Sequence, residues 1–362
     1  MTGNDGTNEA ADDIWLLLSD KLGDNAQVLA LARASGLAHS VKHLAMQPHY
    51  VLGKPRFRPG LSHLDLARSD PLEPPWPRMV ITIGRRPSMA ALWIKERSPS
   101  TRLVLVGRPK RWIERFDLVV APPHFLVPPA DNVVQLTLPL MRADEQAVAR
   151  AGDAWRGRLE DMARPLTAVM VGGQTRPFRF DADVGCDLAR ALTEIVARDG
   201  GSIYATTSRR TGSGVVEELG RSLPAGARIY RWGTDPPEDN PYMGLLASAD
   251  RFVVTGDSIS MQVEVAGLGK PLAIFPLPLS RRPDVRLWRA MGGLLAPGRP
   301  LGEFLRHRGV TGFVRDIEAF HRQLYQAGLA VPVADAFADP SGAVADEVRT
   351  VAARVRRLYE QA

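Results

Sequence analysis

Cysteine is nearly absent from this chain, because Cys186 is the only one among 362 residues. A single thiol cannot form an internal disulfide, which is typical of a reducing compartment. Long apolar runs are also missing, since runs such as Ile14–Leu18 and Leu103–Val106 are far shorter than the ~20 residues that span a bilayer. Acidic residues precede the first apolar run, the reverse of a signal peptide. We therefore expect a cytoplasmic, water-soluble protein.

Several motifs with a known chemistry are missing too. Histidine, cysteine and carboxylates show no metal-ligand spacing, and there is no Gly-x-Ser-x-Gly turn for a serine nucleophile. Neither a Gly-x-Gly-x-x-Gly frame nor a phosphate-binding-loop lysine is found. His124 follows a predicted strand, yet a packing or surface role is favoured for it. We expect no metal and no common hydrolase site.

The charge of the chain is +6, and arginine supplies most of its cations. Because a guanidinium binds phosphate bidentately, an anionic partner is one interpretation. The candidates are a nucleotide diphosphate, nucleic acid, or an anionic membrane surface that would hold the chain peripherally at the inner membrane face. Arginine usage set by genome composition is the alternative. Nucleic acid is disfavoured, since no interleaved aromatic and basic residues accompany the arginines.

The length of the chain exceeds what one hydrophobic core usually organises. Short β-branched runs alternate with helical patterns, which is typical of α/β proteins with parallel sheets. We expect two Rossmann-like domains, over residues 1–163 and 164–340, followed by an amphipathic C-terminal helix over 341–362. The polar stretch Ala143–Ala163 separates the two alternations, which places the boundary near Arg164.

Each half has its own set of predicted elements. In the first half, strands are expected over Ile14–Ser19, Val41–Met46, Met79–Ile83, Arg102–Val106, Asp117–Ala121 and Val133–Leu136, with helices near Asn25–Ser35 and Ser88–Arg97. In the second half, strands are expected over Ala168–Val171, Ser202–Thr206, Arg228–Tyr230, Phe252–Thr255 and Leu272–Phe275, with helices over Ala182–Arg198, Gly212–Ser222, Tyr242–Ser248 and Ile259–Gly267.

Three segments lie outside this alternation. The proline- and arginine-rich segment Pro48–Arg78 is predicted to be an extended surface excursion. The small-residue tail through Ala11 is typical of disorder. Near the end, valines from Val344 to Val355 recur at helical spacing with arginines between them, which predicts a helix with one packing face.

Ligands of open α/β sheets bind beyond the carboxyl ends of the strands, so the loops there are the candidate sites. Ser19–Asn25 follows the first strand, and either Asp24 or Asn25 can cap the next helix. Asp24 is the candidate general base, with Asp20 and Lys21 nearby to adjust its pKa. Ordinary turn and cap chemistry is the alternative. The segment Gly84–Ser88 places two arginines at a helix start. They can bind a phosphate, and the alternative is that the segment is an ordinary solvent-exposed basic turn.

Two loops of the second half suit a phosphate. The paired glycines of Gly172-Gly173-Gln174 follow a strand, so their amides can face a diphosphate. The segment Thr206–Gly212, which includes Ser208 and Arg209, adds hydroxyls and cations at the same edge. We predict that both loops contact a nucleotide.

The segment Val254–Glu264 is the most specific. A strand ends at Thr255, and the polar residues Asp257, Ser258 and Ser260 gather at the positive end of the next helix. Glu264 lies about two turns into that helix, where a carboxylate can accept both ribose hydroxyls. This segment predicts binding of a diphosphate and a ribose together.

Asp257-Ser258, Gln262, Glu264 and Leu268–Pro271 resemble the donor segment of UDP-N-acetylglucosamine 2-epimerase, and more broadly that of GT-B glycosyltransferases. The resemblance implies two domains facing across a cleft, with the acceptor on the first and a UDP- or GDP-linked sugar on the second. It also implies that Ser258 binds phosphate and Glu264 binds ribose. Ile259 and Ser260 stand where the epimerases have two glycines, so close backbone approach to the phosphate differs here.

A second resemblance extends over nearly the whole chain. It is carried by Ser19–Gln27, Gly84-Arg85, Gly172-Gly173, Thr206–Thr211 and Thr255–Ser258, which resemble the bacterial branch of the elongated-mitochondria type of mitochondrial fission protein. The resemblance implies an adaptor function, because plant members of that family are adaptors that recruit a dynamin-related protein. Two hypotheses follow. One is a nucleotide-sugar-dependent glycosyltransferase or epimerase-like enzyme, and the other is a non-catalytic adaptor that binds a protein partner through Pro48–Arg78 or the terminal helix.

Overall fold

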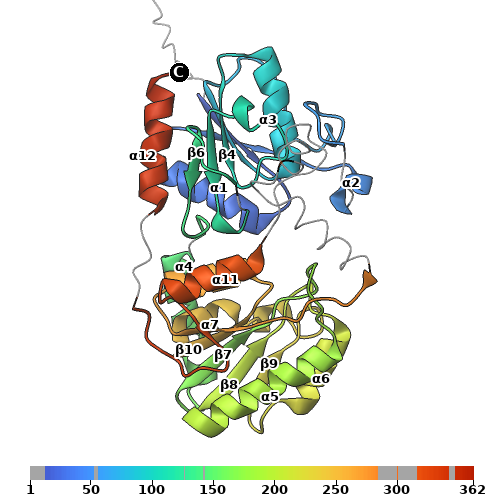
Figure 1. Ribbon diagram of the computed structural model, residues 1–362, viewed down its shortest axis with the longest axis vertical. Coiled ribbons are helices and arrows are strands. Elements are labelled where there is room, and N and C mark those ends of the chain that lie inside the picture. The colour runs from blue at the N-terminus through green and yellow to red at the C-terminus, as the bar shows by residue number, and fades with distance from the viewer. Residues whose placement is uncertain are drawn as a thin grey trace, which may run out of the picture. The chain divides into compact units, whose positions relative to one another are not determined.

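The computed structural model describes residues 13–52, 56–125, 127–141, 143–283, 300, 316–341 and 347–362. The chain divides into two compact units (Figure 1). Unit 1 comprises Met1–Met141, Leu294–Arg315 and Asp346–Ala362, and unit 2 comprises Arg142–Gly293 and Asp316–Ala345. The first division lies between Met141 and Arg142, whereas the sequence placed a boundary near Arg164. The tail through Ala11 and the residue Val344 lie outside the described residues.

Unit 1 is built on a six-stranded parallel sheet with the order β2-β1-β3-β4-β5-β6. Its strands are β1 (Ile14–Leu18), β2 (Ser40–His43), β3 (Met79–Ile83), β4 (Arg102–Val106), β5 (Leu118–Ala121) and β6 (Val133–Gln135). The order reverses between β1 and β3, which is the point where doubly wound sheets open a crevice. The inner strands are almost entirely buried and mostly apolar because both faces of the sheet are covered.

The two faces of this sheet carry different helices. Leu16 and Leu18 alternate with Trp15 and Leu17, so they belong to separate core clusters. One cluster includes residues of α3 (Arg85–Arg97), and the other includes residues of α1 (Leu22–Ser35) and α12 (Glu347–Glu360). Helix α12 packs against α1, and Figure 1 shows the two helices crossing. The apolar side of the terminal helix is therefore buried inside unit 1.

The prediction of a surface excursion over Pro48–Arg78 was wrong. The segment begins with the short helix α2 (Pro48–Leu52), and the side chains of Phe57, Leu64 and Leu72 are buried in the core cluster beside α3. The described part of the segment after α2 has no regular helix, but its apolar residues bury surface as any core residue does. This segment closes one face of the first sheet.

Unit 2 has a second six-stranded parallel sheet, with the order β12-β11-β10-β7-β8-β9. Its strands are β7 (Leu166–Met170), β8 (Ser202–Thr206), β9 (Arg228–Tyr230), β10 (Arg251–Thr255), β11 (Leu272–Phe275) and β12 (Val331–Pro332). Counted from β7, this is the Rossmann order 3-2-1-4-5-6. The order reverses between β7 and β10, so the expected crevice lies at their carboxyl ends.

The described α-helices of unit 2 are α4 (Glu145–Leu159), α5 (Ala182–Asp199), α6 (Ser213–Ser222), α7 (Tyr242–Ser248), α8 (Ile259–Gly267) and α11 (Ile317–Gln326). Among them, α4 packs against α7 and α5 packs against α6 (Figure 1). A Cβ at Gly244 would collide with the ring of Trp155, so this glycine lets α4 and α7 approach closely. The α/β fold with two Rossmann-like sheets is confirmed.

Candidate functional site

The turns after β7 and β10 are joined by a hydrogen-bonded network. The amide of Gly172 donates to Oγ1 of Thr255 at 2.8 Å, and the amide of Gly173 donates to Oδ2 of Asp257 at 2.8 Å. The Thr255 hydroxyl in turn donates to Oδ1 of Asp257 at 2.8 Å. Asp257 thus lies at the centre of the network, at the point where the strand order reverses.

Both glycine amides are consequently occupied by the chain itself. A Cβ on Gly172 would collide with the carboxylate of Asp257, and a Cβ on Gly173 would collide with the backbone carbonyl of Arg210. The paired glycines are needed because two neighbouring turns come too close for any side chain. Their role in this structure is close packing of the loops, whereas the sequence suggested amides open to a diphosphate.

The carboxylate of Asp257 is completely buried. Burial raises its pKa above the ordinary value, although the hydrogen bonds from Gly173 and Thr255 and the charge of Arg210 act in the opposite direction. The Arg210 guanidinium lies 3.9 Å from Oδ2 and is itself half exposed. A buried acid and a solvent-facing cation therefore share one corner of the site.

The other predicted residues of these loops hold the loops in shape. The Ser208 hydroxyl donates to the carbonyl of Gly172 at 2.9 Å. The Gln174 amide donates to the Phe178 carbonyl at 2.6 Å and accepts from the Phe180 amide at 3.1 Å. Arg209, in contrast, is exposed. Gln174 is exposed as well, although its side-chain amide is bonded within its own loop, whereas the Arg209 side chain makes no hydrogen bond with the described residues of these loops.

Helix α8 begins at this edge without a side-chain cap. Ser258 is its N-cap residue and makes no capping hydrogen bond, while Asp144, Asp181 and Asp316 each cap the helix that follows them. The first-turn amides, including that of Ser260, have no partner within the helix. An uncapped helix start attracts an anion through these amides and the helix dipole.

Glu264 lies farther along the same helix and is held by a residue that sequence reasoning missed. The Tyr242 hydroxyl, from α7, donates to Oε2 of Glu264 at 2.6 Å. Burial raises the pKa of Glu264, and the bond from Tyr242 lowers it. The pKa of Tyr242 is raised by burial and by the neighbouring carboxylate. Glu264 remains able to accept further hydrogen bonds through Oε1.

Two buried side chains, those of Gln262 and His321, pack against the turn between β10 and α8. The Gln262 amide donates to the Thr255 carbonyl at 3.2 Å and lies 3.3 Å from Nε2 of His321. His321, from α11, packs so closely that a Cβ on Gly256 would lie 2.9 Å from its ring. Burial lowers the pKa of His321 to about 4. No local pattern points to His321, because α11 is distant along the chain from β10 and α8.

Trp232 is a third residue of the site that could not be chosen from the motifs. It follows β9, its side chain is among the most exposed large hydrophobic groups described, and its amide donates to Oγ1 of Thr207 at 2.8 Å. Thr207 follows β8 directly. The indole therefore lies at the same sheet edge as the loops above. An aromatic residue directly after a predicted strand was the available signal.

The predicted general base lies in unit 1. Helix α1 begins at Leu22, so Asp24 belongs to its first turn, and the expectation that Asp24 or Asn25 caps the helix was wrong. Asn25 instead bonds to the backbone of Ser19. The Asp24 carboxylate, about 39% exposed, lies 3.8 Å from the Lys21 ammonium. A Cβ on Gly84 would lie 3.8 Å from Asp24, so the loops after β1 and β3 meet.

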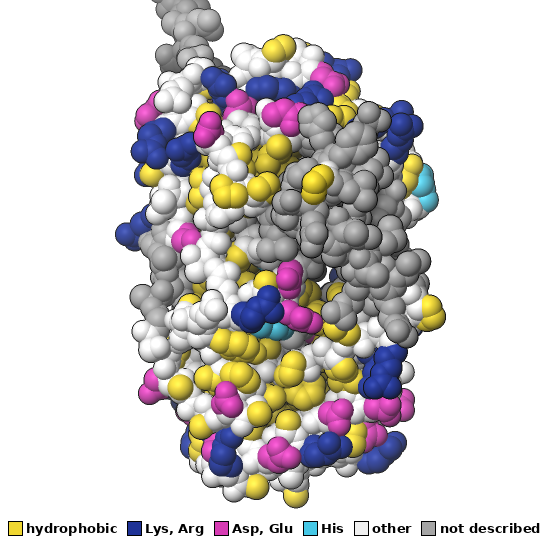
Figure 2. All heavy atoms as spheres, viewed as in Figure 1, with side chains coloured by type: hydrophobic (Ala, Val, Ile, Leu, Met, Phe, Trp, Pro, Cys, Tyr) yellow, Lys and Arg dark blue, Asp and Glu magenta, His cyan; other side chains and the backbone are white. Residues whose placement is uncertain are grey.

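The remaining surface features are mixed. On the face drawn in Figure 2, outside the grey atoms, cationic and anionic side chains are interspersed. Among the described residues, none of the helices is both long and apolar enough to cross a membrane. The same residues contain no group of three or more histidine, cysteine or acidic side chains placed to hold a metal ion. His124 is buried beside Phe125, at 5% exposure.

The sequence was compared with known proteins. The pattern of the family described as "Mitochondrial fission ELM1" matches residues 23–294. The mitochondrial fission protein ELM1 of Arabidopsis thaliana is 30% identical over 221 residues, which are 55% of this chain and 51% of that protein, so the match spans about half of the plant relative. An uncharacterised protein of Rickettsia prowazekii, RP120, is 26% identical over 298 residues, covering 74% of this chain and 84% of that one.

Solved structures with a similar fold include sugar-nucleotide enzymes. UDP-GlcNAc 2-epimerase from Methanocaldococcus jannaschii aligns with a TM-score of 0.49 and 10% identity, over 95% of this chain and 99% of that one. A UDP-glucosyltransferase from Polygonum tinctorium aligns with a TM-score of 0.44 and 10% identity, over 96% and 98%.

Proposed function

The chain belongs to the mitochondrial fission ELM1 family, and we propose that its second unit binds a nucleoside diphosphate sugar at the carboxyl edge of the Rossmann-ordered sheet. One observation carries the proposal: the uncapped start of α8 and the half-buried Glu264 lie on the same helix. At 1.5 Å of rise per residue, Glu264 is about 7 Å along the axis from the first turn. A diphosphate at the amides and a ribose at the carboxylate fit this order.

The diphosphate would be held by charge as well as by amides. The exposed Arg209 and the half-exposed Arg210 lie on the loop after β8 and can turn toward a ligand. Asp257 is the unfavourable neighbour, because its charge would repel a phosphate. Its raised pKa lessens this cost, since a bound anion favours the protonated acid further.

The base of the nucleotide would stack on Trp232. The Trp232 side chain is 49% exposed, and a planar ligand stacked on its indole would remove apolar surface from water. The bond from its amide to Thr207 fixes the backbone at that point. Uracil and guanine both present a suitable ring, so UDP- and GDP-linked sugars remain the two donor classes.

For an enzyme of this kind, the acceptor would bind to unit 1, with Asp24 as the general base. Its carboxylate is partly exposed and lies where the loops after β1 and β3 meet. A general base must reach the acceptor hydroxyl, and an exposed carboxylate at a sheet edge has that access. The reaction would then be glycosyl transfer from the bound nucleotide sugar.

A non-catalytic adaptor is the second candidate. It is favoured by the closed network of Gly172, Gly173, Thr255 and Asp257, which satisfies its own polar groups without a ligand. An adaptor function also agrees with membership of a family that is named for mitochondrial fission. The segment 48–78 is a poor docking surface because its apolar residues are buried. Helix α12 carries exposed arginines, of which Arg354 and Arg356 also donate to backbone carbonyls of unit 1, and a partner or an anionic membrane would have to bind beside these bonds.

A thermal-shift screen separates these two functions. A ligand that binds only the folded chain raises its apparent stability by about 2.7 kcal/mol when present at 100 times its dissociation constant. We expect UDP- or GDP-sugars to raise the melting temperature, and the increase to be smaller in Glu264→Gln. If no nucleotide sugar shifts the melting temperature, the adaptor is the better account.

A further inference from the structure

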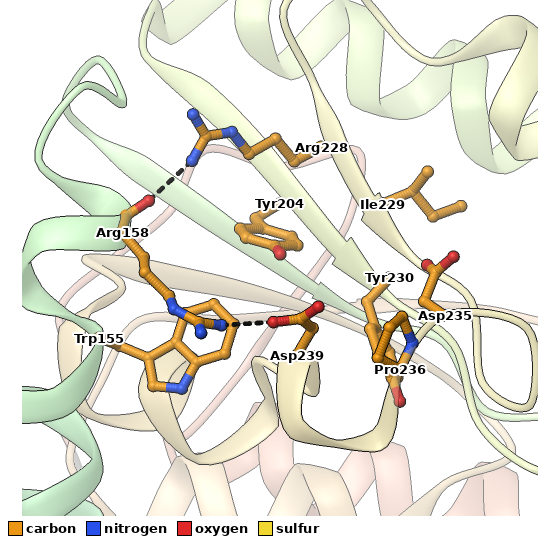
Figure 3. A pocket seen from close by; sticks show the side chains of 9 residues that line it. All are labelled: Trp155, Arg158, Tyr204, Arg228, Ile229, Tyr230, Asp235, Pro236 and Asp239. Carbon is orange, nitrogen blue, oxygen red and sulfur yellow. Dashed lines mark hydrogen bonds and ion pairs between the residues drawn. The ribbon is translucent and has the colours of Figure 1, made fainter.

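Unit 2 also contains a pocket that extends from one face of its sheet to the loop after β9, the loop that carries Trp232. It has a volume of about 500 Å³, within the range of roughly 300–1,000 Å³ that small-molecule sites occupy. It is lined by α4, the strands β8 and β9, and the loop that follows β9 (Figure 3). Tyr204 enters it from the middle of β8, opposite Arg228 of β9 in the sheet register. The pocket therefore lies on a face of the sheet.

Aromatic rings form one wall. The rings of Trp155 and Tyr204 lie edge to face, with centroids 6.4 Å apart, as Figure 3 shows. Trp155 rests directly on the backbone of Gly244, where any side chain would collide with it. The wall is thus preformed, and a ligand need not order it.

Charges in the pocket are already compensated. Arg158 donates to Asp239 at 2.8 Å, and its guanidinium lies over the Trp155 ring. Arg228 pairs with Asp161. A separate ion pair joins Asp235 to Arg231 on the loop after β9. The two arginines and two aspartates that line the pocket sum to zero charge. A charged ligand would find no unpaired opposite charge here.

Hydroxyl groups supply the remaining polar character. In the part of the chain that the structure describes, neither the Tyr204 nor the Tyr230 hydroxyl makes a hydrogen bond. A purely apolar ligand would cover these hydroxyls and the carboxylates without replacing their bonds to water, which is costly. The occupant must be neutral, flat enough to lie on an aromatic ring, and rich in hydrogen-bonding groups.

We propose that this pocket binds a neutral sugar residue. The C–H face of a pyranose ring would lie against the Tyr204 ring, next to Trp155, which Arg158 covers on one side. Its hydroxyls would donate to Asp235 or Asp239 and accept from Arg228, each of which has further bonding capacity. This site takes a saccharide without a nucleotide, so it can hold a glycan while the sheet edge is empty.

Saturation-transfer NMR on the full chain tests this site. The probes are glucose, N-acetylglucosamine, mannose and their neutral disaccharides, with glucose 6-phosphate as the charged comparison. We expect at least one neutral sugar to bind and to be favoured over the phosphate. Tyr204→Phe should weaken binding about three- to tenfold through the lost hydroxyl, and Trp155→Ala should remove it.

Tyr325→Phe is the matched control, because Tyr325 lies on α11 and does not line the pocket. It should leave sugar binding unchanged. Tyr204→Phe keeps the ring and therefore the fold, so its effect reports the hydroxyl alone. The proposal is overturned if no neutral sugar binds, if the sugar phosphate binds more tightly, or if Tyr204→Phe and Trp155→Ala bind as the wild type does. Nucleotide-sugar binding at the sheet edge is measured separately and affects none of these results.

Discussion

The hydroxyl of Tyr242 donates a 2.6 Å hydrogen bond to Oε2 of Glu264 and so joins α7 to α8. This bond holds the carboxylate in one orientation and leaves Oε1 to a ligand. It also favours the charged form of an acid whose pKa burial raises. Glu264 is therefore prepared to accept hydrogen bonds before any ligand arrives.

Removing this hydroxyl should weaken the site without removing it. In Tyr242→Phe, Glu264 loses a hydrogen bond to a charged group, which is worth about 1.5–3 kcal/mol, and it becomes free to adopt other rotamers. We expect affinity for the nucleotide sugar to fall by about tenfold, as measured by calorimetric titration. Unchanged affinity would show that Tyr242 does not orient the carboxylate.

The paired glycines should be intolerant of even one methyl group. In Gly173→Ala, the new Cβ must displace the Arg210 backbone, so we expect a loss of stability of at least ~2 kcal/mol, comparable with other overpacking changes. Gly212→Ala is the control at the same edge, since its Cβ would meet open space and its φ of −67° suits any residue. Urea denaturation measures both. Equal stabilities would contradict the close approach of the loops.

The segment after α2 should behave as core. Leu64 is 2% exposed and Leu66 is 63% exposed, so the two leucines form a matched pair. Leu64→Ala should cost about 2–5 kcal/mol of unfolding free energy, while Leu66→Ala should change it by less than about 0.5 kcal/mol. A small effect at both positions would mean that the segment does lie on the surface.

His321 should make stability depend on pH. Its pKa is lowered to about 4 in the folded chain, so the unfolded chain binds the proton first as the pH falls below 6.5. The stability from burying the neutral ring is full above pH 6.5 and is lost between there and about 4, on the order of 3 kcal/mol at ~1.36 kcal/mol per pH unit. Denaturation at pH 7 and 4.5 should show a smaller difference in His321→Gln. Equal differences would argue against a buried neutral ring.

Asp257 should make ligand binding depend on pH in the opposite sense. Because burial raises its pKa and a bound diphosphate would raise it further, binding takes up a proton. Affinity should therefore increase as the pH falls toward the raised pKa of Asp257, and Asp257→Asn should flatten this dependence. An affinity that rises with pH would contradict a phosphate beside Asp257.

Much of the fold could be predicted from local patterns. Strands such as β3 and β4 are mostly apolar because parallel sheets are covered on both faces, and their predicted bounds match the structure. The order of the strands in the sheet, in contrast, could not be predicted from local patterns. Nothing local in the sequence says that β10 lies beside β7, and that pairing is what brings Asp257 to Gly173.

The candidate site was predictable where its residues follow strands. Ser258 and Glu264 could be chosen because a helix start and a carboxylate on the same helix have a fixed spacing. Tyr242 and His321 could not, since they reach the site through the packing of α7 and α11. For Gly172 and Gly173, local sequence could not show that the amides bond to Thr255 and Asp257, because these partners follow another strand.

The most direct measurement is calorimetric titration of the whole chain with UDP- and GDP-linked sugars, in the wild type and in Glu264→Ala. The account predicts that one of these nucleotide sugars binds, and that Glu264→Ala weakens it by about tenfold or more because the ribose hydroxyls lose a charged acceptor. Absence of binding across the series, or equal binding by the variant, would contradict it.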